Sequence, residues 1–208
     1  MSDVVIVDYG MGNLRSVQKA LERVGADAVI SSDPSQVADA RRLVLPGVGA
    51  FGDAMRELQQ RKLVKPIRRF LDSQRPFLGI CLGLQLLFDS SDEGAEESGA
   101  PVRGLGVLPG RVVRFPASDR HKVPHMGWNQ VTSCQESPLM GNIDASSWFY
   151  FVHSYYVVPE RSEDVWLESD YIVPFCAAVR RGAVHATQFH PEKSQQVGLR
   201  LLANFVTL

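Results

Sequence analysis

Residues 79–85 read Gly-Ile-Cys-Leu-Gly-Leu-Gln, and they directly follow the apolar run Pro-Phe-Leu at 76–78. The pattern predicts a short buried strand, a turn at Cys81, and an apolar helix that begins at once. Gly79 and Gly83 flank the cysteine at a distance of two residues, which is the spacing of a nucleophile elbow with cysteine in place of serine. Glycine suits both positions because a sharp strand-to-helix turn strains the nucleophile's backbone and leaves little room for neighbouring side chains.

The predicted turn would place the sulfur of Cys81 at the N-terminus of a helix. Free N–H groups and the positive end of the helix dipole favour an anion there, and the thiolate is the reactive form of cysteine. A buried structural cysteine is the alternative, and it is the usual explanation for an isolated cysteine. The two flanking glycines favour the nucleophile over that alternative.

A cysteine nucleophile needs a base, and His190 is the candidate among the five histidines of the chain. It follows the alternating run at 183–187, and a histidine that closes a strand of a parallel sheet can stand at the same edge as the elbow. Pro191 keeps His190 extended, so residues two apart point the same way and Glu192 can reach the imidazole. Cys81, His190 and Glu192 are therefore the predicted nucleophile, base and orienting acid. Without the elbow, a chance histidine in a polar turn would be the better interpretation.

A glycine-rich loop at 46–52, Pro-Gly-Val-Gly-Ala-Phe-Gly, follows the apolar run at 42–45. Its glycines let backbone N–H groups approach a ligand closely, and acyl transfer needs such donors aimed at the developing oxyanion. The N–H group of Val48 or Gly49, together with that of Leu82, is the predicted oxyanion site. A plain tight turn before the next helix is the alternative for this loop alone.

These three segments together resemble the class I, or triad, glutamine amidotransferases. Segments at 8–16, 124–129, 150–155 and 188–194 are similar to one family within that class, the glutaminase subunits of imidazole glycerol phosphate synthases. The resemblance covers essentially the whole chain, with the motifs in the family's order. It implies an α/β fold of the class I glutamine amidotransferase type, with a central, mostly parallel sheet flanked by helices and an antiparallel β extension in the second half.

The resemblance also implies a reaction and a partner. The chain would hydrolyse glutamine to glutamate and ammonia, and would channel the ammonia to a (β/α)8 cyclase subunit in a heterodimer. That subunit makes imidazole glycerol phosphate and aminoimidazole carboxamide ribotide in histidine biosynthesis. No cofactor and no metal is expected.

Further site residues follow partly from spacing and partly from the resemblance. Gln85 lies one turn beyond Cys81 on the same face of the predicted helix, so its amide can reach a substrate beside the thiol. The resemblance adds three residues that would hold the amino and carboxylate groups of glutamine: Gly47, Ser154 and Tyr155. It also implies five residues that would contact the cyclase: Asn13, Met126, Trp128, Tyr150 and Lys193.

Composition favours a single domain over residues 1–208, because a chain of 208 residues with 45% hydrophobic content can bury one core. The net charge of −1 and the lack of a basic stripe indicate no nucleic-acid partner. The first apolar run is too short and too acidic at its edges for a signal peptide, and no run reaches the length of a membrane span. The cysteines are odd in number and widely separated, which argues against a disulfide framework. We therefore expect a cytoplasmic protein.

Strand and helix patterns alternate through the first half of the chain, which predicts a parallel, doubly wound sheet. Strands are expected at 4–7, 28–30, 43–45 and 77–80. Helices are expected at 14–24, from Asp33-Pro34 onward, over 52–71 with a break near Pro66, and from Leu82 through Phe88. The acidic run at 89–97 is expected to be a solvated loop. After Gly99, short strands and turns lead to a strand at 183–189 and a closing helix at 195–206.

Three rival functions remain open. An amidotransferase that serves a different synthase would keep the triad but change the partner surface. A stand-alone cysteine hydrolase would be fully active without a partner, and a silent binding module would be unaffected by the loss of Cys81.

A dinucleotide site at Gly10-Met-Gly12 is disfavoured because Arg15 occupies the position of the third glycine. His153 and His185 lie inside strand patterns and are expected to be structural.

Overall fold

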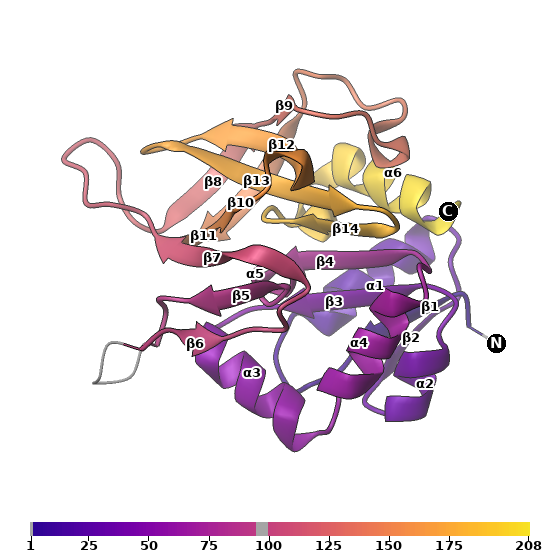
Figure 1. Cartoon of the computed structure of the whole chain (residues 1–208). Helices are drawn as coiled ribbons and strands as arrows, with labels where there is room; N and C mark the ends of the chain where they lie inside the picture. The colour runs from indigo at the N-terminus through magenta and orange to yellow at the C-terminus, as the bar shows by residue number, and fades with distance from the viewer. Residues whose placement is uncertain (1, 95–99) are drawn as a thin grey trace.

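The computed structural model describes residues 2–94 and 100–208, and Figure 1 shows their arrangement. Its strands are β1 (Val4–Val7), β2 (Ala28–Ser31), β3 (Leu43–Gly47), β4 (Phe77–Cys81), β5 (Phe88–Ser91), β6 (Val102–Arg103), β7 (Leu108–Arg114), β8 (His125–Gln130), β9 (Thr132–Ser133), β10 (Trp148–His153), β11 (Tyr155–Pro159), β12 (Val165–Asp170), β13 (Pro174–Arg181) and β14 (Val184–Thr187). The helices are α1 (Leu14–Arg23), α2 (Pro34–Asp39), α3 (Phe51–Gln60), α4 (Val64–Asp72), α5 (Leu82–Gln85) and α6 (Gln195–Val206).

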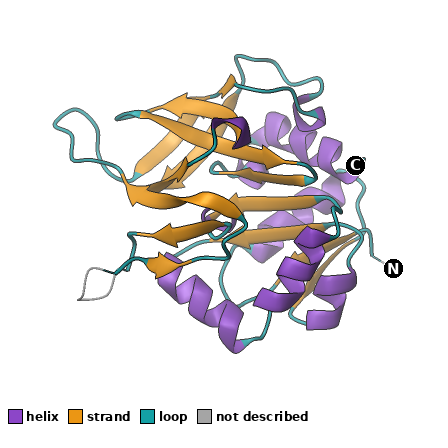
Figure 2. Ribbon diagram, in the orientation of Figure 1, coloured by secondary structure: helices purple, strands orange, loops and turns teal. Residues whose placement is uncertain are grey.

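The first four strands and β14, which comes from near the C-terminus, form a parallel sheet in the order β2-β1-β3-β4-β14. Its central strands are buried on both faces, which is why they are continuous apolar runs. Side chains alternate between two cores: Val5 packs with α3 and α4 residues, whereas Ile6 packs with α1 and α6 residues. Helices therefore cover both faces of the sheet (Figure 2).

The second half extends the same sheet with antiparallel strands. β13 pairs with β14, β11 joins β13 to β7, and β5 and β6 complete the edge, where β5 and β7 pair in parallel. β8 and β10 form a separate two-stranded antiparallel sheet, in which Trp128 faces Tyr150 and His125 faces His153. The predicted fold class, a mostly parallel sheet with an antiparallel extension, is confirmed.

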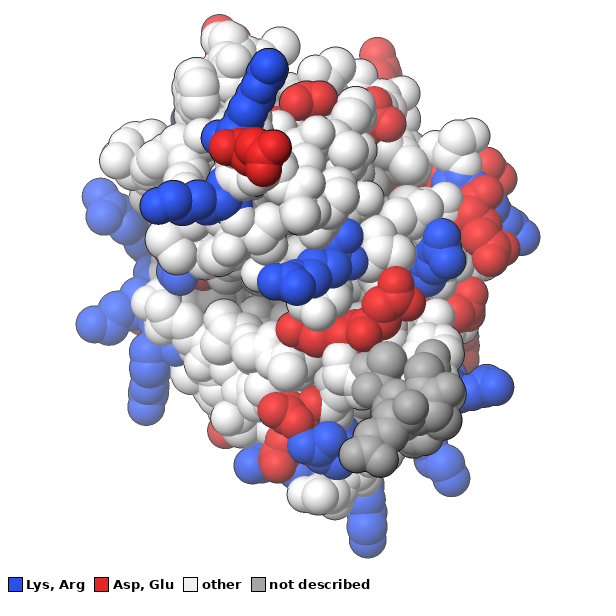
Figure 3. All heavy atoms as spheres, turned by 90° about the vertical axis from the view of Figure 1, so that its left-hand side faces the viewer, with Lys and Arg blue, Asp and Glu red and all other residues white. Residues whose placement is uncertain are grey.

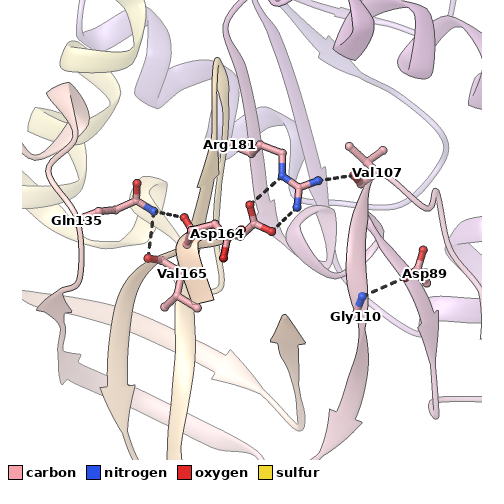
Figure 4. A network of polar contacts seen from close by, with 8 residues as sticks. Asp89, Val107, Gly110, Gln135, Asp164, Val165 and Arg181 are labelled. Atoms are coloured by element: carbon pink, nitrogen blue, oxygen red, sulfur yellow. Dashed lines mark hydrogen bonds and ion pairs between the residues drawn. The ribbon is translucent and has the colours of Figure 1, made fainter. Parts of the chain in front are cut away.

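An ion pair ties the antiparallel half together, as Figure 4 shows. Arg181 on β13 bonds the carboxylate of Asp164, whose side chain is only 4% exposed, and also donates to the carbonyl of Val107 at 3.1 Å. Nearby, Gln135 donates to the carbonyl of Val165 at 3.0 Å. These bonds connect β12, β13 and the start of β7. Because Asp164 is buried, loss of Arg181 alone would leave an unpaired buried charge.

The predicted helix after Cys81 is wrong beyond Gln85. α5 is a single turn, and Phe88 begins β5 instead. The carbonyls of Leu86 and Leu87 accept hydrogen bonds from the backbone N–H groups of Leu105 and Val107, both at 2.8 Å. Tertiary pairing with a distant segment therefore overrides the local helical pattern.

The predicted solvated loop at 89–97 is wrong at 89–91, which belong to β5, whereas 92–94 form the predicted turn at the surface. Asp89 lies within β5, and its carboxylate accepts the N–H of Gly110 at 3.0 Å (Figure 4). The carboxylate of Glu93 accepts the N–H of Phe51 at 2.9 Å. Residues 95–97 lie outside the described part of the chain. Two of the acidic side chains thus serve as acceptors for backbone groups.

The helix predicted over 52–71 is two helices, but the break lies before Pro66 and not at it. α3 ends at Gln60, Lys62 has a φ of +58°, and α4 begins at Val64. Pro66 lies in the first turn of α4, where proline is tolerated because the N–H group it lacks would have no helical partner.

Candidate active site

Cys81 ends β4 with a φ of +55° and a ψ of −107°, a strained conformation that L-residues rarely adopt. α5 begins at the next residue. β3 and β14 hold β4 in register on both sides, with Gly47 opposite Cys81 and Thr187 opposite Ile80. The neighbouring strands therefore fix the turn that presents the sulfur.

The glycines around Cys81 are required by the backbone packed against them. A Cβ atom on Gly83 would overlap the carbonyl oxygen of Leu45 in β3. A Cβ atom on Gly79 would come within 2.9 Å of the carbonyl oxygen of Gly83 and of the Cβ of Ala186. Both glycines thus allow β3, β4, β14 and α5 to approach one another closely.

His190 and Glu192 form a buried pair just beyond β14. Nδ1 of His190 lies 2.9 Å from Oε1 of Glu192, and the two side chains are 3% and 1% exposed. The backbone N–H of His190 donates to the carbonyl of Tyr150 at 2.9 Å, and its carbonyl accepts from the hydroxyl of Ser194 at 2.7 Å. The backbone of His190 is therefore held through both its N–H and its carbonyl group, and its imidazole is held by Glu192. The structure brings together the three residues predicted as a triad.

Nε2 is the ring nitrogen of His190 that Glu192 does not bind, and His190 and Cys81 line the same cleft. Among the residues that the structure describes, Nε2 of His190 has no hydrogen-bond partner of ordinary length. Burial by itself lowers the pKa of His190, but the Cys81 thiolate and, more weakly, Glu192 outweigh it and raise the pKa to about 10. The arrangement therefore favours a protonated imidazole in the same cleft as the sulfur of Cys81.

The site opens into a cleft of about 420 Å³. The residues that line it are Val48, Gly49, Cys81, Leu82, Gln85, Glu93, Pro124, Val152, His153, Ser154, Tyr155 and His190. They include all three predicted oxyanion residues and three of the four predicted substrate residues. The fourth, Gly47, is the β3 partner of Cys81.

The glycine-rich loop lies beside the elbow because β3 and β4 are neighbours in the sheet. Gly49 has a φ of +96°, and a Cβ atom there would lie 2.7 Å from Cε of Met11, so glycine is needed at this position. Leu82 is the first residue of α5, and its N–H group has no helical acceptor. Both predicted sources of oxyanion donors thus border the cleft.

Tyr9 and Glu93 are among the residues of the site that the sequence analysis missed. Tyr9 is buried, and its hydroxyl lies so close to Gly47 that a Cβ atom there would overlap it. Burial and the negative charge at Cys81 raise the pKa of Tyr9, so the phenol stays neutral. Glu93 lines the cleft, and burial raises the pKa of its carboxyl group. The position of Tyr9 after the first strand was a usable signal, because parallel strands end at one edge of the sheet.

Four of the five predicted partner residues gather on one surface. Met126 and Trp128 on β8 are 63% and 42% exposed. The ring of Tyr150 lies edge-on to Trp128 at 6.0 Å, and Nζ of Lys193 lies 5.8 Å from the centre of that tyrosine ring. Asn13 belongs to a different hollow, at the start of α1.

Charges of both signs are scattered over the face shown in Figure 3, with uncharged surface between them. Within residues 2–94 and 100–208, every helix is too short or too polar to cross a membrane. The same residues contain no group of three or more histidine, cysteine or acidic side chains placed to hold a metal ion.

Comparisons with known proteins show what this chain is similar to. The family model for glutamine amidotransferase class-I matches residues 5–208. A protein of Syntrophotalea carbinolica named imidazole glycerol phosphate synthase subunit HisH is 56% identical, over 97% of this chain and 98% of its own. A protein of the same name from Rhodopirellula baltica is 57% identical, over 98% of this chain and 97% of its own. The structure of PurLQS from Thermotoga maritima has a TM-score of 0.75 at 19% identity, covering 100% of this chain and 99% of that one, which shows the fold alone.

Gly83→Ala tests the packing of the elbow. The new Cβ atom would overlap the backbone of β3, so we expect the free energy of unfolding to fall by about 3 kcal/mol or more. Gly52→Ala is the matched control, because its Cβ atom would meet Val102 at an ordinary 3.8 Å and would leave stability unchanged or raised by up to about 1 kcal/mol. Denaturant unfolding measures both, and equal stability of the two variants would contradict the packing argument.

The pKa of His190 predicts a pH dependence. Because its folded value of about 10 lies above the ordinary 6.5, the protonated imidazole stabilises the fold below pH 6.5, and this contribution is lost as the pH rises towards 10. Cys81→Ala removes the thiolate, so the pKa of His190 should fall. NMR titration of the imidazole ring in both proteins measures the change. An identical midpoint in the two would mean that Cys81 carries no charge felt by His190.

Proposed function

The chain belongs to the class-I glutamine amidotransferases and, within them, to the HisH subunits of imidazole glycerol phosphate synthase, and on that premise we propose how it hydrolyses glutamine and where the ammonia goes. The observation that carries the proposal is the strained Cys81 in a cleft shared with the buried His190–Glu192 pair. This constellation is suited to acyl transfer from a carboxamide through a thioester.

In the first step, the thiolate of Cys81 attacks the carboxamide carbon of glutamine. A carbon–sulfur bond forms, and the carbonyl oxygen becomes an oxyanion that accepts hydrogen bonds from the N–H of Val48 or Gly49 and from that of Leu82. The tetrahedral intermediate then collapses. Nε2 of His190 gives its proton to the departing nitrogen, the carbon–nitrogen bond breaks, and ammonia leaves a thioester on Cys81.

In the second step, water hydrolyses the thioester. His190, now neutral, takes a proton from the attacking water, and Glu192 stabilises the imidazolium that results. The carbon–sulfur bond breaks, which releases glutamate and restores the thiolate. Gly47, Gln85, Ser154 and Tyr155 hold the amino and carboxylate groups of the substrate at the other end of the cleft.

The partner in this proposal is a cyclase subunit that docks on Met126, Trp128, Tyr150 and Lys193, with Asn13 at a second point of contact. The exposed aromatic side chains support this choice, because aromatic residues are enriched in interfaces. Ammonia that escaped into water would be protonated and lost as a nucleophile. We therefore propose direct delivery through the partner, in the cytoplasm, as a step of histidine biosynthesis.

Cys81→Ser, assayed in the complex with the cyclase, separates the two chemistries. Glutamine-dependent synthesis should fall at least about a thousandfold, because the nucleophile is lost. Ammonia-dependent synthesis should persist within about twofold, because the cyclase can take ammonia from solution.

Cys134→Ser is the matched control for this experiment, because Cys134 is an exposed cysteine outside the cleft. Both activities of that variant should equal those of the wild type. If Cys81→Ser abolished ammonia-dependent synthesis in an intact complex, the proposed division of labour would be wrong.

A further inference from the structure

A series of hydrogen-bonded side chains runs from the β8–β10 sheet into the cleft. Nδ2 of Asn129 lies 3.4 Å from Nε2 of His125, and Nδ1 of His125 lies 3.1 Å from Nε2 of His153. Nδ1 of His153 lies 2.8 Å from the carbonyl oxygen of Tyr155. Both histidines are buried, at 3% and 7% exposure. This series of hydrogen bonds therefore ends on the backbone carbonyl of Tyr155, a residue that lines the cleft of the proposed glutamine site.

The same carbonyl anchors a second group of bonds that leads to the nucleophile. Nε2 of Gln85 donates to the carbonyl oxygen of Tyr155 and to Oε1 of Gln188, each at 3.0 Å. Nε2 of Gln188 then lies 3.6 Å from the sulfur of Cys81. The carbonyl of Tyr155 is thus the acceptor that the β8–β10 sheet and the turn at Cys81 share.

The chemistry of the groups allows only one direction for these bonds. A carbonyl oxygen can only accept, so Nδ1 of His153 must carry a proton. Burial lowers the pKa of His153 to about 3 and that of His125 to about 4, so both rings are neutral near pH 7. Nε2 of His153 is therefore a lone pair that accepts from Nδ1–H of His125. Nε2 of His125 in turn accepts from Asn129.

Asn129 is itself oriented by two further bonds. Its amide oxygen accepts the backbone N–H of Gln130 at 2.9 Å, and its amide nitrogen also donates to the carbonyl of Asp170 at 2.7 Å. His125 stacks between two rings, with centroid distances of 4.9 Å to Phe151 and 4.1 Å to Tyr171. Neither the amide of Asn129 nor the ring of His125 can rotate without breaking these contacts.

The consequence for Gln85 is a fixed amide orientation. Both of its N–H bonds are used, by Tyr155 and by Gln188, so its oxygen is the atom left to bind a ligand. An oxygen suits the positively charged amino group of an amino acid, whereas an N–H group would repel it. The orientation of this amide therefore determines whether the site accepts an α-ammonium group.

We propose that His125, His153 and Asn129 are positioning residues of the glutamine site: they hold the Tyr155 carbonyl that orients the amide of Gln85. This inference rests on the proposed function, because it assigns the amino group of glutamine to Gln85. It gives a role to the histidines of the segments at 124–129 and 150–155, which the hydrolysis itself does not use.

Two substitutions of His125 separate this role from simple packing. His125→Phe keeps an aromatic ring between Phe151 and Tyr171 but removes the donor to His153. His125→Asn loses the ring but keeps an amide N–H close to the position of Nδ1. We expect His125→Phe to raise KM for glutamine about tenfold, the effect of one unpaired buried acceptor, with kcat changed less than about threefold.

His125→Asn should restore KM to within about threefold of the wild type, even where its thermal stability is lower. A packing role predicts the opposite order, with His125→Phe the milder change. Both variants are assayed for glutamine hydrolysis in the complex with the cyclase. A wild-type KM in His125→Phe, or a higher KM in His125→Asn than in His125→Phe, would overturn the proposal.

A second measurement does not depend on turnover. ¹⁵N NMR of the wild-type protein should show both His125 and His153 as neutral rings protonated at Nδ1, the tautomer that this chain requires. Protonation of His153 at Nε2 would overturn the proposal. If the wild-type complex failed to hydrolyse glutamine while the tautomers were as expected, the proposed function would be at fault and the hydrogen-bonded chain would stand.

Discussion

The strained backbone of Cys81 is the constraint on which the site depends. A φ of +55° persists at a non-glycine residue only where the surroundings hold it, and here β3 and β14 flank β4 in register while α5 starts without a linker. The same alignment ends β3 at Gly47, opposite the sulfur, and lets the chain after β14 reach His190. One packing arrangement therefore places the proposed nucleophile, oxyanion loop and base at one edge of the sheet.

The antiparallel extension completes what the parallel half begins. β10 and β11 supply the wall of the cleft opposite the elbow, where Tyr155 accepts bonds from both Gln85 and His153. The β8–β10 sheet also carries the exposed Trp128 and the ring of Tyr150. The proposed docking surface and the substrate end of the cleft therefore share one structural unit.

Local patterns in the sequence predicted the elements whose causes are local. Glycines at Gly79 and Gly83 identify the elbow, and Pro191 between His190 and Glu192 identifies the segment that carries the base. The structure brings these residues together, while their catalytic roles remain proposals. The β5 strand was missed because the carbonyls of Leu86 and Leu87 pair with residues about twenty positions away. No local pattern contains that information.

Other parts of the site were missed for the same reason. The cleft contact of Glu93, the approach of Tyr9 to Gly47 and the pairing of His125 with His153 join segments distant in sequence. Each of these contacts can be identified only from the paired strands of the folded sheet. The type of chemistry could thus be predicted from short motifs, whereas the residues that position it could not.

The central claim is that Cys81 is the nucleophile of a glutamine-specific cleft, and its labelling by a glutamine-analogue electrophile tests this most directly. Peptide mass spectrometry of the protein in complex with the cyclase should find the adduct on Cys81, and excess glutamine should protect it. The exposed Cys134 and the buried Cys176 should remain unmodified by the analogue, although a small neutral alkylating agent should reach Cys134. Preferential labelling of Cys134 or Cys176, or labelling of Cys81 that glutamine does not slow, would contradict the account.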